Sequence, residues 1–190
     1  MNRPVLTIIA GSNGCGKSTL TSSARDKFQQ YPVLDPDAIA KSIQETLGPI
    51  HSDIEAGKRV LRNAEDLIVA AQSFTVETTL SGSTYLKMAV RAKKAGFNIM
   101  VIFIGTASVE INIERIKTRV LKGGHDVPEG DQRRRYPRTL ANMKRLLPLA
   151  DLAVLLDNSD EKAHTMVGFG HKGYMQWREP LPEWAAELSR

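Results

Sequence analysis

The stretch Gly11-Ser12-Asn13-Gly14-Cys15-Gly16-Lys17-Ser18 matches the P-loop pattern G-x-x-x-x-G-K-[ST] at every fixed position. The apolar run Val5–Ile9 before it indicates a buried strand, and Thr19 and Leu20 after it open a helix. In this setting backbone N–H groups turn toward a polyphosphate, and the start of the helix adds positive potential. The stretch therefore predicts that the chain binds a nucleoside triphosphate.

The loop also predicts which residues touch the nucleotide and its metal ion. Lys17 is expected to reach the β- and γ-phosphates of ATP, and the Ser18 hydroxyl to ligate Mg²⁺. The predicted contacts are Asn13, Gly14, Cys15, Gly16, Lys17, Ser18 and Thr19. Cys15 is the single cysteine, so an internal disulfide is excluded and we interpret it as structural.

Composition narrows the class of protein. At 190 residues and 42% hydrophobic content, the chain is expected to form one domain over residues 1–190. Its longest uninterrupted apolar run, Ile99–Ile104, is far too short to span a bilayer. Together with the lone cysteine, this predicts a cytoplasmic protein that does not act on membranes.

Strand and helix patterns alternate along the chain, which predicts an α/β fold: a five-stranded parallel sheet with helices on both faces. The expected strands are Val5–Ile9, Val33–Asp35, Ser73–Val76, Asn98–Ile104 and Leu152–Leu156. The expected helices are Lys17–Gln29, Ala38–Thr46, Asp53–Gln72, Thr84–Ala95, Ser108–Leu121 and Asp131–Leu146. The tail from Gly168 to Arg190 is ambiguous, with an edge strand at Met166–Phe169 and a helix at Pro182–Leu188 as its candidate elements.

Positive charge is concentrated in one segment. The formal net charge is +5, but residues 115–145 carry +7 and the rest of the chain −2. Gly123-Gly124 interrupts this segment between Arg119 and the run that contains Arg134, as expected for a lid over about 119–136 that closes on phosphates. The alternative is an ordinary solvated basic face. A nucleic-acid binder would spread its charge and interleave aromatic residues, so nucleic acid is not the expected partner.

Asp35 and Asp37 follow the second predicted strand, with Pro36 between them. In an extended segment, positions two apart project to the same side, here toward the crevice where open α/β folds bind ligands. One of these two carboxylates could accept the proton of an attacking hydroxyl, and Asp35 is also a candidate substrate contact. Alternatively, Asp37 simply caps the helix that begins at Ala38.

Glu77 and Thr78 follow the third predicted strand directly. A carboxylate at the carboxyl end of a parallel strand can hold a metal-bound water or a substrate hydroxyl. The alternative is that Glu77 and its neighbouring threonines form a polar cluster that faces water. In many P-loop enzymes, an apolar strand that ends in an aspartate supports Mg²⁺, and the stretch Leu152–Asp157 is only a weak match to that pattern. Metal support is therefore expected from Asp35, Asp37 or Glu77.

Taken in order, these motifs resemble the zeta-toxin-like P-loop kinases. The resemblance rests on the P-loop, Asp35-Pro36-Asp37, Glu77-Thr78-Thr79 and the segment Gly123-Gly124-His125-Asp126-Val127-Pro128 followed by Arg134-Arg135-Tyr136. It implies a nucleotide-kinase-like fold and Mg²⁺-dependent transfer of phosphate from ATP to a hydroxyl, that of UDP-N-acetylglucosamine in the best-known members. By position it implies Asp37 as base, Glu77 as a substrate or metal contact, Lys17 as a phosphate contact and Arg119 with Arg134 or Arg135 as lid arginines.

The sequence thus predicts an ATP-dependent kinase of a small-molecule hydroxyl, with UDP-N-acetylglucosamine as the first acceptor to test and an antitoxin protein as a partner to test. An antibiotic or metabolite kinase, similar to chloramphenicol phosphotransferase, is the alternative within this fold. A nucleotide-switched ATP-binding module that acts on nucleic acid is the alternative from another class. Asp37 separates these classes, because a kinase needs a base aimed at an acceptor.

Overall fold

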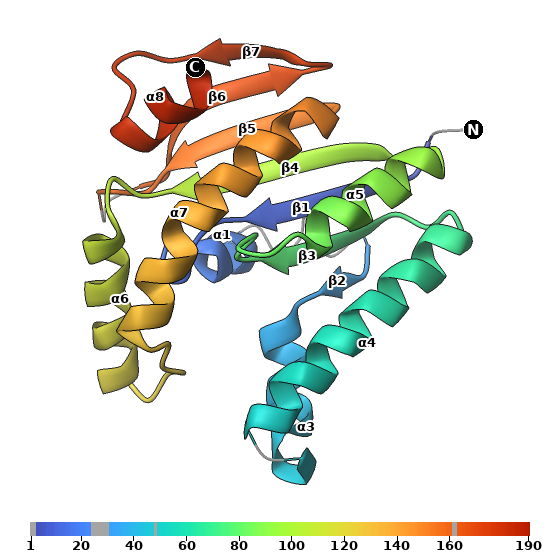
Figure 1. The fold of residues 1–190 in the computed structure, drawn as a ribbon, viewed down its shortest axis with the longest axis vertical. Coiled ribbons are helices and arrows are strands. Elements are labelled where there is room, and N and C mark those ends of the chain that lie inside the picture. The colour runs from blue at the N-terminus through green and yellow to red at the C-terminus, as the bar shows by residue number, and fades with distance from the viewer. Residues whose placement is uncertain (1–2, 24–30, 48, 161–162) are drawn as a thin grey trace.

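A seven-stranded sheet with the order β2-β3-β1-β4-β5-β6-β7 forms the centre of the molecule (Figure 1). The computed structural model describes residues 3–23, 31–47, 49–160 and 163–190. The strands are β1 (Val5–Ala10), β2 (Val33–Leu34), β3 (Phe74–Thr78), β4 (Asn98–Gly105), β5 (Leu152–Asp157), β6 (Thr165–His171) and β7 (Tyr174–Trp177). Strands β1 to β5 are mutually parallel, which confirms the predicted α/β P-loop fold.

The predicted count of five strands was incomplete. Strands β6 and β7 continue the sheet antiparallel beyond β5, and β7 rather than Met166–Phe169 forms its edge. Lys172 and Gly173, both with positive φ, join the two strands in a two-residue hairpin turn. The helix expected in the tail is present as α8 (Glu183–Ser189).

The other helices are α1 (Lys17–Ser23), α3 (Pro36–Leu47), α4 (Pro49–Val69), α5 (Thr84–Lys94), α6 (Val109–Leu121) and α7 (Glu129–Leu146), with a short 3₁₀ turn η1 (Leu147–Leu149). Helices α3 and α7 each begin two residues earlier than predicted, and α4 begins four residues earlier and ends three residues earlier than the predicted Asp53–Gln72. The predicted end of the first helix, 24–29, lies outside the described residues. Among the described residues, none of the helices combines the length and apolar character needed to cross a membrane.

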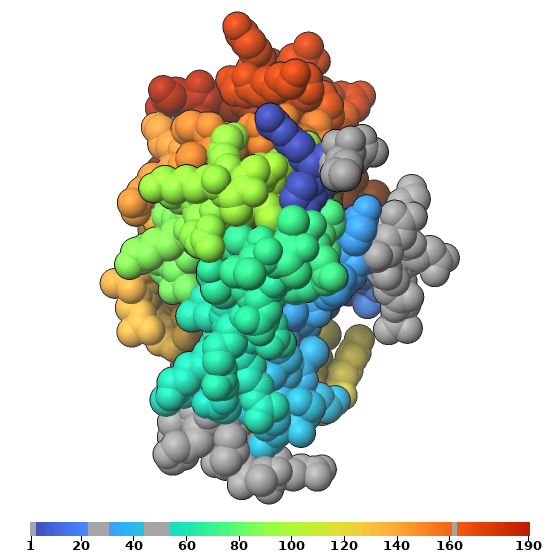
Figure 2. Space-filling view, turned by 90° about the vertical axis from the view of Figure 1, so that its right-hand side faces the viewer, coloured from blue at the N-terminus to red at the C-terminus, as the bar shows by residue number. Residues whose placement is uncertain are grey.

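Helices α4, α5, α7 and α8 share one hydrophobic core with the sheet, in which Phe74, Phe103 and Trp184 are among the largest fully buried side chains. Figure 2 shows α4 and α5 forming much of one outer face of the molecule. Polar bonds then fix α7 across the ends of two strands. Tyr136 donates to the Thr106 carbonyl at 2.6 Å, and Thr139 to the Thr79 carbonyl at 2.7 Å. These bonds therefore hold α7 itself at the carboxyl ends of β3 and β4.

Candidate active site

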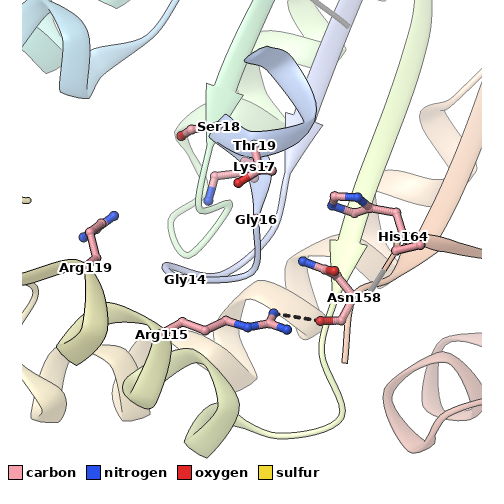
Figure 3. Close-up of a pocket in the computed structure, with 10 residues that line it drawn as sticks. Gly14, Gly16, Lys17, Ser18, Thr19, Arg115, Arg119, Asn158 and His164 are labelled. Carbon is pink, nitrogen blue, oxygen red and sulfur yellow. Dashed lines mark hydrogen bonds between the residues drawn. The ribbon is translucent and has the colours of Figure 1, made fainter. Parts of the chain in front are cut away.

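The P-loop joins β1 to α1 and forms one wall of a pocket of about 430 Å³, which we call the phosphate pocket (Figure 3). The pocket is lined by Gly14, Gly16, Lys17, Ser18, Thr19, Arg115, Arg119, Asn158, Ala163 and His164. Gly16 has φ +103°, and a Cβ there would lie 2.5 Å from the Asn158 amide nitrogen. That position therefore requires glycine on two grounds, backbone conformation and space.

Lys17 lies where the motif predicts it, at the start of α1 and within this pocket. Its ammonium group donates to the carbonyls of Gly11 at 2.8 Å and Ser12 at 3.1 Å. These bonds fold the side chain back over the loop, so its charge stays beside the backbone N–H groups of the P-loop. Among the described residues that line the pocket, Lys17, Arg115 and Arg119 are cationic and none is anionic. A polyphosphate is the ligand that such a charge distribution favours.

Sequence reasoning missed four lining residues of this pocket: Arg115, Asn158, Ala163 and His164. Asn158 follows β5 and donates its amide to the Cys15 carbonyl at 2.8 Å, while Arg115 donates to the Asn158 carbonyl at 2.7 Å. His164 enters from the start of the antiparallel strand β6 (Figure 3). The position of Asn158 at the carboxyl end of a parallel strand was the available signal. Cys15 itself is fully buried, and burial raises the pKa of its thiol, as expected for a structural residue.

The helix cap beside the second strand is Asp35 and not Asp37. Helix α3 begins at Pro36, and the Asp35 carboxylate accepts from the Asp37 N–H at 2.9 Å while its carbonyl accepts from the Ile39 N–H at 3.1 Å. The alternative in which Asp37 caps a helix from Ala38 is therefore wrong. Asp37 lies in the first turn with its side chain exposed, so its carboxylate is available to a ligand.

Glu77 lies within β3 rather than after it and is 7% exposed. Its carboxylate accepts a short hydrogen bond from Thr21, whose hydroxyl also donates to the Lys17 carbonyl at 2.8 Å. Burial raises the pKa of Glu77, and the nearby charges of Asp35 and Asp37 act in the same direction. The pKa of Asp35 is likewise raised by burial. Glu77 thus belongs to one carboxylate group at the P-loop, and the interpretation as a water-facing polar cluster is wrong.

The buried charge of Glu77 leads to a testable stability effect. Because the folded state raises its pKa above the unfolded value of about 4.3, stability from this group is greatest below that pH and is lost as the pH rises through the raised pKa. We therefore expect Glu77→Gln to melt at a higher temperature than the wild type at neutral pH, with the difference shrinking in acid. Thermal melts across pH test this, with the exposed Glu187→Gln as matched control; parallel curves for wild type and Glu77→Gln would contradict it.

These oxygen groups also fit a magnesium ion. Ser18 presents its hydroxyl in the phosphate pocket, and Glu77 and Asp35 supply carboxylates beside the loop. Within the described ranges, no three His, Cys, Asp or Glu side chains come together as a metal cluster. Mg²⁺ is commonly held by one or two protein oxygens plus phosphates, so the set suits a nucleotide-bound ion. Asp157, the weak strand candidate, instead accepts from Trp184 and Ser159, each at 2.8 Å, and anchors the tail.

A second pocket, of about 290 Å³, lies between the P-loop, the start of α3 and the loop before α7; we call it the Asp37 pocket. It is lined by Asn13, Pro36, Asp37, His125, Asp126, Val127, Pro128, Asp131 and Arg135. Asp37 therefore lies in a cavity whose wall includes a P-loop residue, which places a carboxylate beside the predicted nucleotide. Thr78 is buried, and its hydroxyl oxygen accepts from the Leu80 N–H at 2.9 Å. Thr78 lines neither pocket.

The Gly-Gly sequence ends α6 in a Schellman motif. The Gly124 N–H bonds to the Arg119 carbonyl and the Gly123 N–H to the Val120 carbonyl, each at 2.9 Å, and Gly123 has φ +80°. A Cβ on Gly124 would lie 2.5 Å from the Arg119 Cγ, so glycine lets that side chain pass. Arg119 then donates to the His125 carbonyl at 2.6 Å and reaches the phosphate pocket.

The arginines that begin α7 have different positions. Arg133 bridges Glu110 and Glu129 on the surface. Arg134 pairs with Asp131 at 2.7 Å and lines neither the phosphate pocket nor the Asp37 pocket, whereas Arg135 pairs with Asp131 at 3.1 Å and lines the latter. The structure thus brings Arg119 and Arg135 to the two pockets and leaves Arg134 outside them.

A P-loop between β1 and α1, a cationic pocket around it and a cluster of carboxylates beside it define the P-loop phosphotransferases. The chain matches the Zeta toxin family over residues 1–167 and belongs to it. It is accordingly an ATP-dependent phosphotransferase of the kinase type. An uncharacterized protein of Haemophilus influenzae is 40% identical over 126 residues, which cover 66% of this chain and 88% of that protein.

Solved structures share the fold. A structure of the PezAT chromosomal toxin–antitoxin system of Streptococcus pneumoniae superposes with a TM-score of 0.64 at 16% identity, covering 99% of this chain and 77% of that one. The AvrRxo1-ORF1:-ORF2 structure with ATP gives a TM-score of 0.64 at 18% identity, covering 98% of this chain. This chain spans only 63% of that AvrRxo1 complex chain.

Proposed function

We propose that this protein transfers the γ-phosphoryl group of ATP to a hydroxyl group of a small molecule bound in the Asp37 pocket. The observation that carries the proposal is the exposed Asp37 carboxylate, which does not cap α3 and shares its pocket with Asn13 of the P-loop. A phosphoryl acceptor in this pocket would lie between a general base and the nucleotide.

In the proposed reaction, Asp37 accepts the acceptor's hydroxyl proton while that oxygen attacks the γ-phosphorus and ADP leaves. Lys17 and Arg119 stabilise the charge that develops on the transferred phosphoryl oxygens. Mg²⁺, when bound through Ser18 with support from Glu77 or Asp35, would neutralise part of the phosphate charge. Arg135 forms part of the wall of the Asp37 pocket, whereas Thr78 holds the backbone N–H of Leu80 at the end of β3.

The proposal is tested by incubating the protein with γ-labelled ATP, Mg²⁺ and a panel of sugars, amino sugars, nucleosides and nucleotide sugars. UDP-N-acetylglucosamine belongs in the panel because of the family, and an antibiotic or metabolite is the second class of acceptor. Label transferred to any acceptor supports a kinase. Label released only as inorganic phosphate, with stimulation by nucleic acid, would instead support a nucleotide-switched module.

An antitoxin is the protein partner that we include in the proposal. The support is membership of the Zeta toxin family together with the shared fold of a structure that is described as part of a toxin–antitoxin system.

The lid arginines give a paired prediction. We expect Arg119→Ala to lower turnover by roughly tenfold, the scale of a lost charge-assisted hydrogen bond, while ATP affinity changes less. Arg134→Ala removes an equal charge at an exposed ion pair outside the two pockets and should change turnover little. Mg·ATP should also slow hydrogen exchange over residues 119–136. An equal change of turnover in Arg119→Ala and Arg134→Ala, with no slowing of hydrogen exchange by Mg·ATP, would identify residues 119–136 as a solvated basic face.

A further inference from the structure

We infer that the acceptor is a sugar or amino sugar without phosphate groups rather than a nucleotide sugar. This inference rests on the proposed function and specifies the substrate class of the Asp37 pocket. It comes from three features of that pocket: its charge, its hydrogen-bonding groups and its size.

The two neighbouring pockets have opposite charge. The described lining residues of the phosphate pocket include Lys17, Arg115 and Arg119 and no acid, which gives them a net charge of +3 with His164 counted as neutral. The Asp37 pocket contains three carboxylates and one guanidinium, a net charge of −2 with His125 counted as neutral. A diphosphate in the Asp37 pocket would face like charges, which costs free energy at short range. The phosphate pocket therefore favours an anionic ligand such as ATP, whereas the Asp37 pocket disfavours an anionic phosphoryl acceptor.

The single guanidinium of the Asp37 pocket is already paired. Arg135 bonds to Asp131 at 3.1 Å, on the same carboxylate that Arg134 contacts at 2.7 Å. Phosphate recognition by arginine normally uses its free N–H fork, and here an intramolecular carboxylate competes for that fork. A phosphate that bound Arg135 would have to displace Asp131 from it and leave that carboxylate paired with Arg134 alone.

Several of the polar atoms in the lining of the Asp37 pocket accept hydrogen bonds. The Asn13 side-chain oxygen is buried and has no hydrogen-bond partner among residues 3–23, 31–47, 49–160 and 163–190. The carboxylates of Asp37 and Asp126 are acceptors as well. A buried acceptor is costly to leave unpaired, so the pocket favours a ligand rich in O–H or N–H donors. Polyols and amino sugars have that character, whereas phosphate oxygens are acceptors only.

The size of the Asp37 pocket agrees with this class. Its volume of about 290 Å³ lies just below the usual range of small-molecule pockets, about 300–1,000 Å³. Pro36, Val127 and Pro128 add apolar surface on which one face of a sugar ring can pack. One or two rings suit this volume better than a sugar joined to a nucleoside diphosphate.

The test compares acceptor selectivity in the wild type and in Asp126→Asn, using labelled ATP with glucosamine, an aminoglycoside, glucose and UDP-N-acetylglucosamine. We expect the first three to be phosphorylated with higher kcat/KM than the nucleotide sugar. Asp126 is exposed, so its loss should raise KM for the cationic acceptors by about fivefold, the upper range for an exposed ion pair, with little change in kcat. The same change should raise KM for glucose less than KM for the cationic acceptors, because the amide oxygen of Asn can still accept an O–H hydrogen bond while the charge is lost.

Asp66→Asn is the matched control, because Asp66 is exposed in the last turn of α4 and lines neither of the two pockets. Added salt should weaken the cationic acceptors in the wild type and have less effect in Asp126→Asn. Preference for UDP-N-acetylglucosamine, unaffected by Asp126→Asn, would overturn the inference while leaving the kinase proposal intact. Absence of any labelled acceptor in the wider panel would overturn the kinase proposal itself.

Discussion

Asp37→Asn is expected to lower acceptor phosphorylation by a factor on the order of 10² or more, the usual scale for a lost general base. An amide has the shape of the carboxylate but cannot take the proton of the attacking hydroxyl. Asp37 does not cap α3, and its side chain is exposed, so melting temperature and Mg·ATP affinity should stay close to wild type. Steady-state kinetics, thermal melts and calorimetry on the same preparation measure all three quantities.

Asp35→Asn provides the comparison for that variant. Asn caps a helix about as well as Asp, so the bond to the Asp37 N–H survives while the neighbouring charge is lost. We expect a smaller loss of activity than for Asp37→Asn. Wild-type activity in Asp37→Asn together with a large loss in Asp35→Asn would assign the base to Asp35.

Lys17→Ala is expected to reduce turnover by about 10² to 10³, the range found when one group that stabilises a transition state is removed. Its ammonium group lies in the phosphate pocket and bonds only to backbone carbonyls of the P-loop among the contacts described, so the core should be unaffected. Calorimetry with Mg·ATP and a turnover assay measure the effect. Lys94→Ala, at the exposed end of α5, removes the same charge outside both pockets. Unchanged affinity and turnover in Lys17→Ala would refute the P-loop assignment.

The parallel part of the fold was predictable because its signals are local. The β1 to β5 strands are short apolar runs, and the P-loop ties one strand to one helix in a fixed geometry. Strands β6 and β7 were harder to predict because their tight turn places Lys172 at φ +48°, a conformation usually marked by Asn, Asp or Gly. The tail also contributes Trp184 to the core, and its bond to Asp157 is a contact between distant positions.

The site was predictable residue by residue only where spacing carries the chemistry. The sequence placed Lys17, Ser18 and Arg119 in one pocket, and the structure agrees. It could not decide between Arg134 and Arg135, because adjacent positions on a helix differ by about 100° in direction. The cap at Asp35 was missed for a related reason, since a start at Pro36 rather than Ala38 exchanges the roles of the two aspartates.

The most direct test of the central claim follows the fate of the γ-phosphate of ATP by ³¹P NMR, in the wild type and in Asp37→Asn, with the full panel of acceptors. The account predicts a phosphate ester that appears in step with ADP for the wild type and is nearly lost in Asp37→Asn. Inorganic phosphate as the sole product in both proteins, at equal rates, would contradict it.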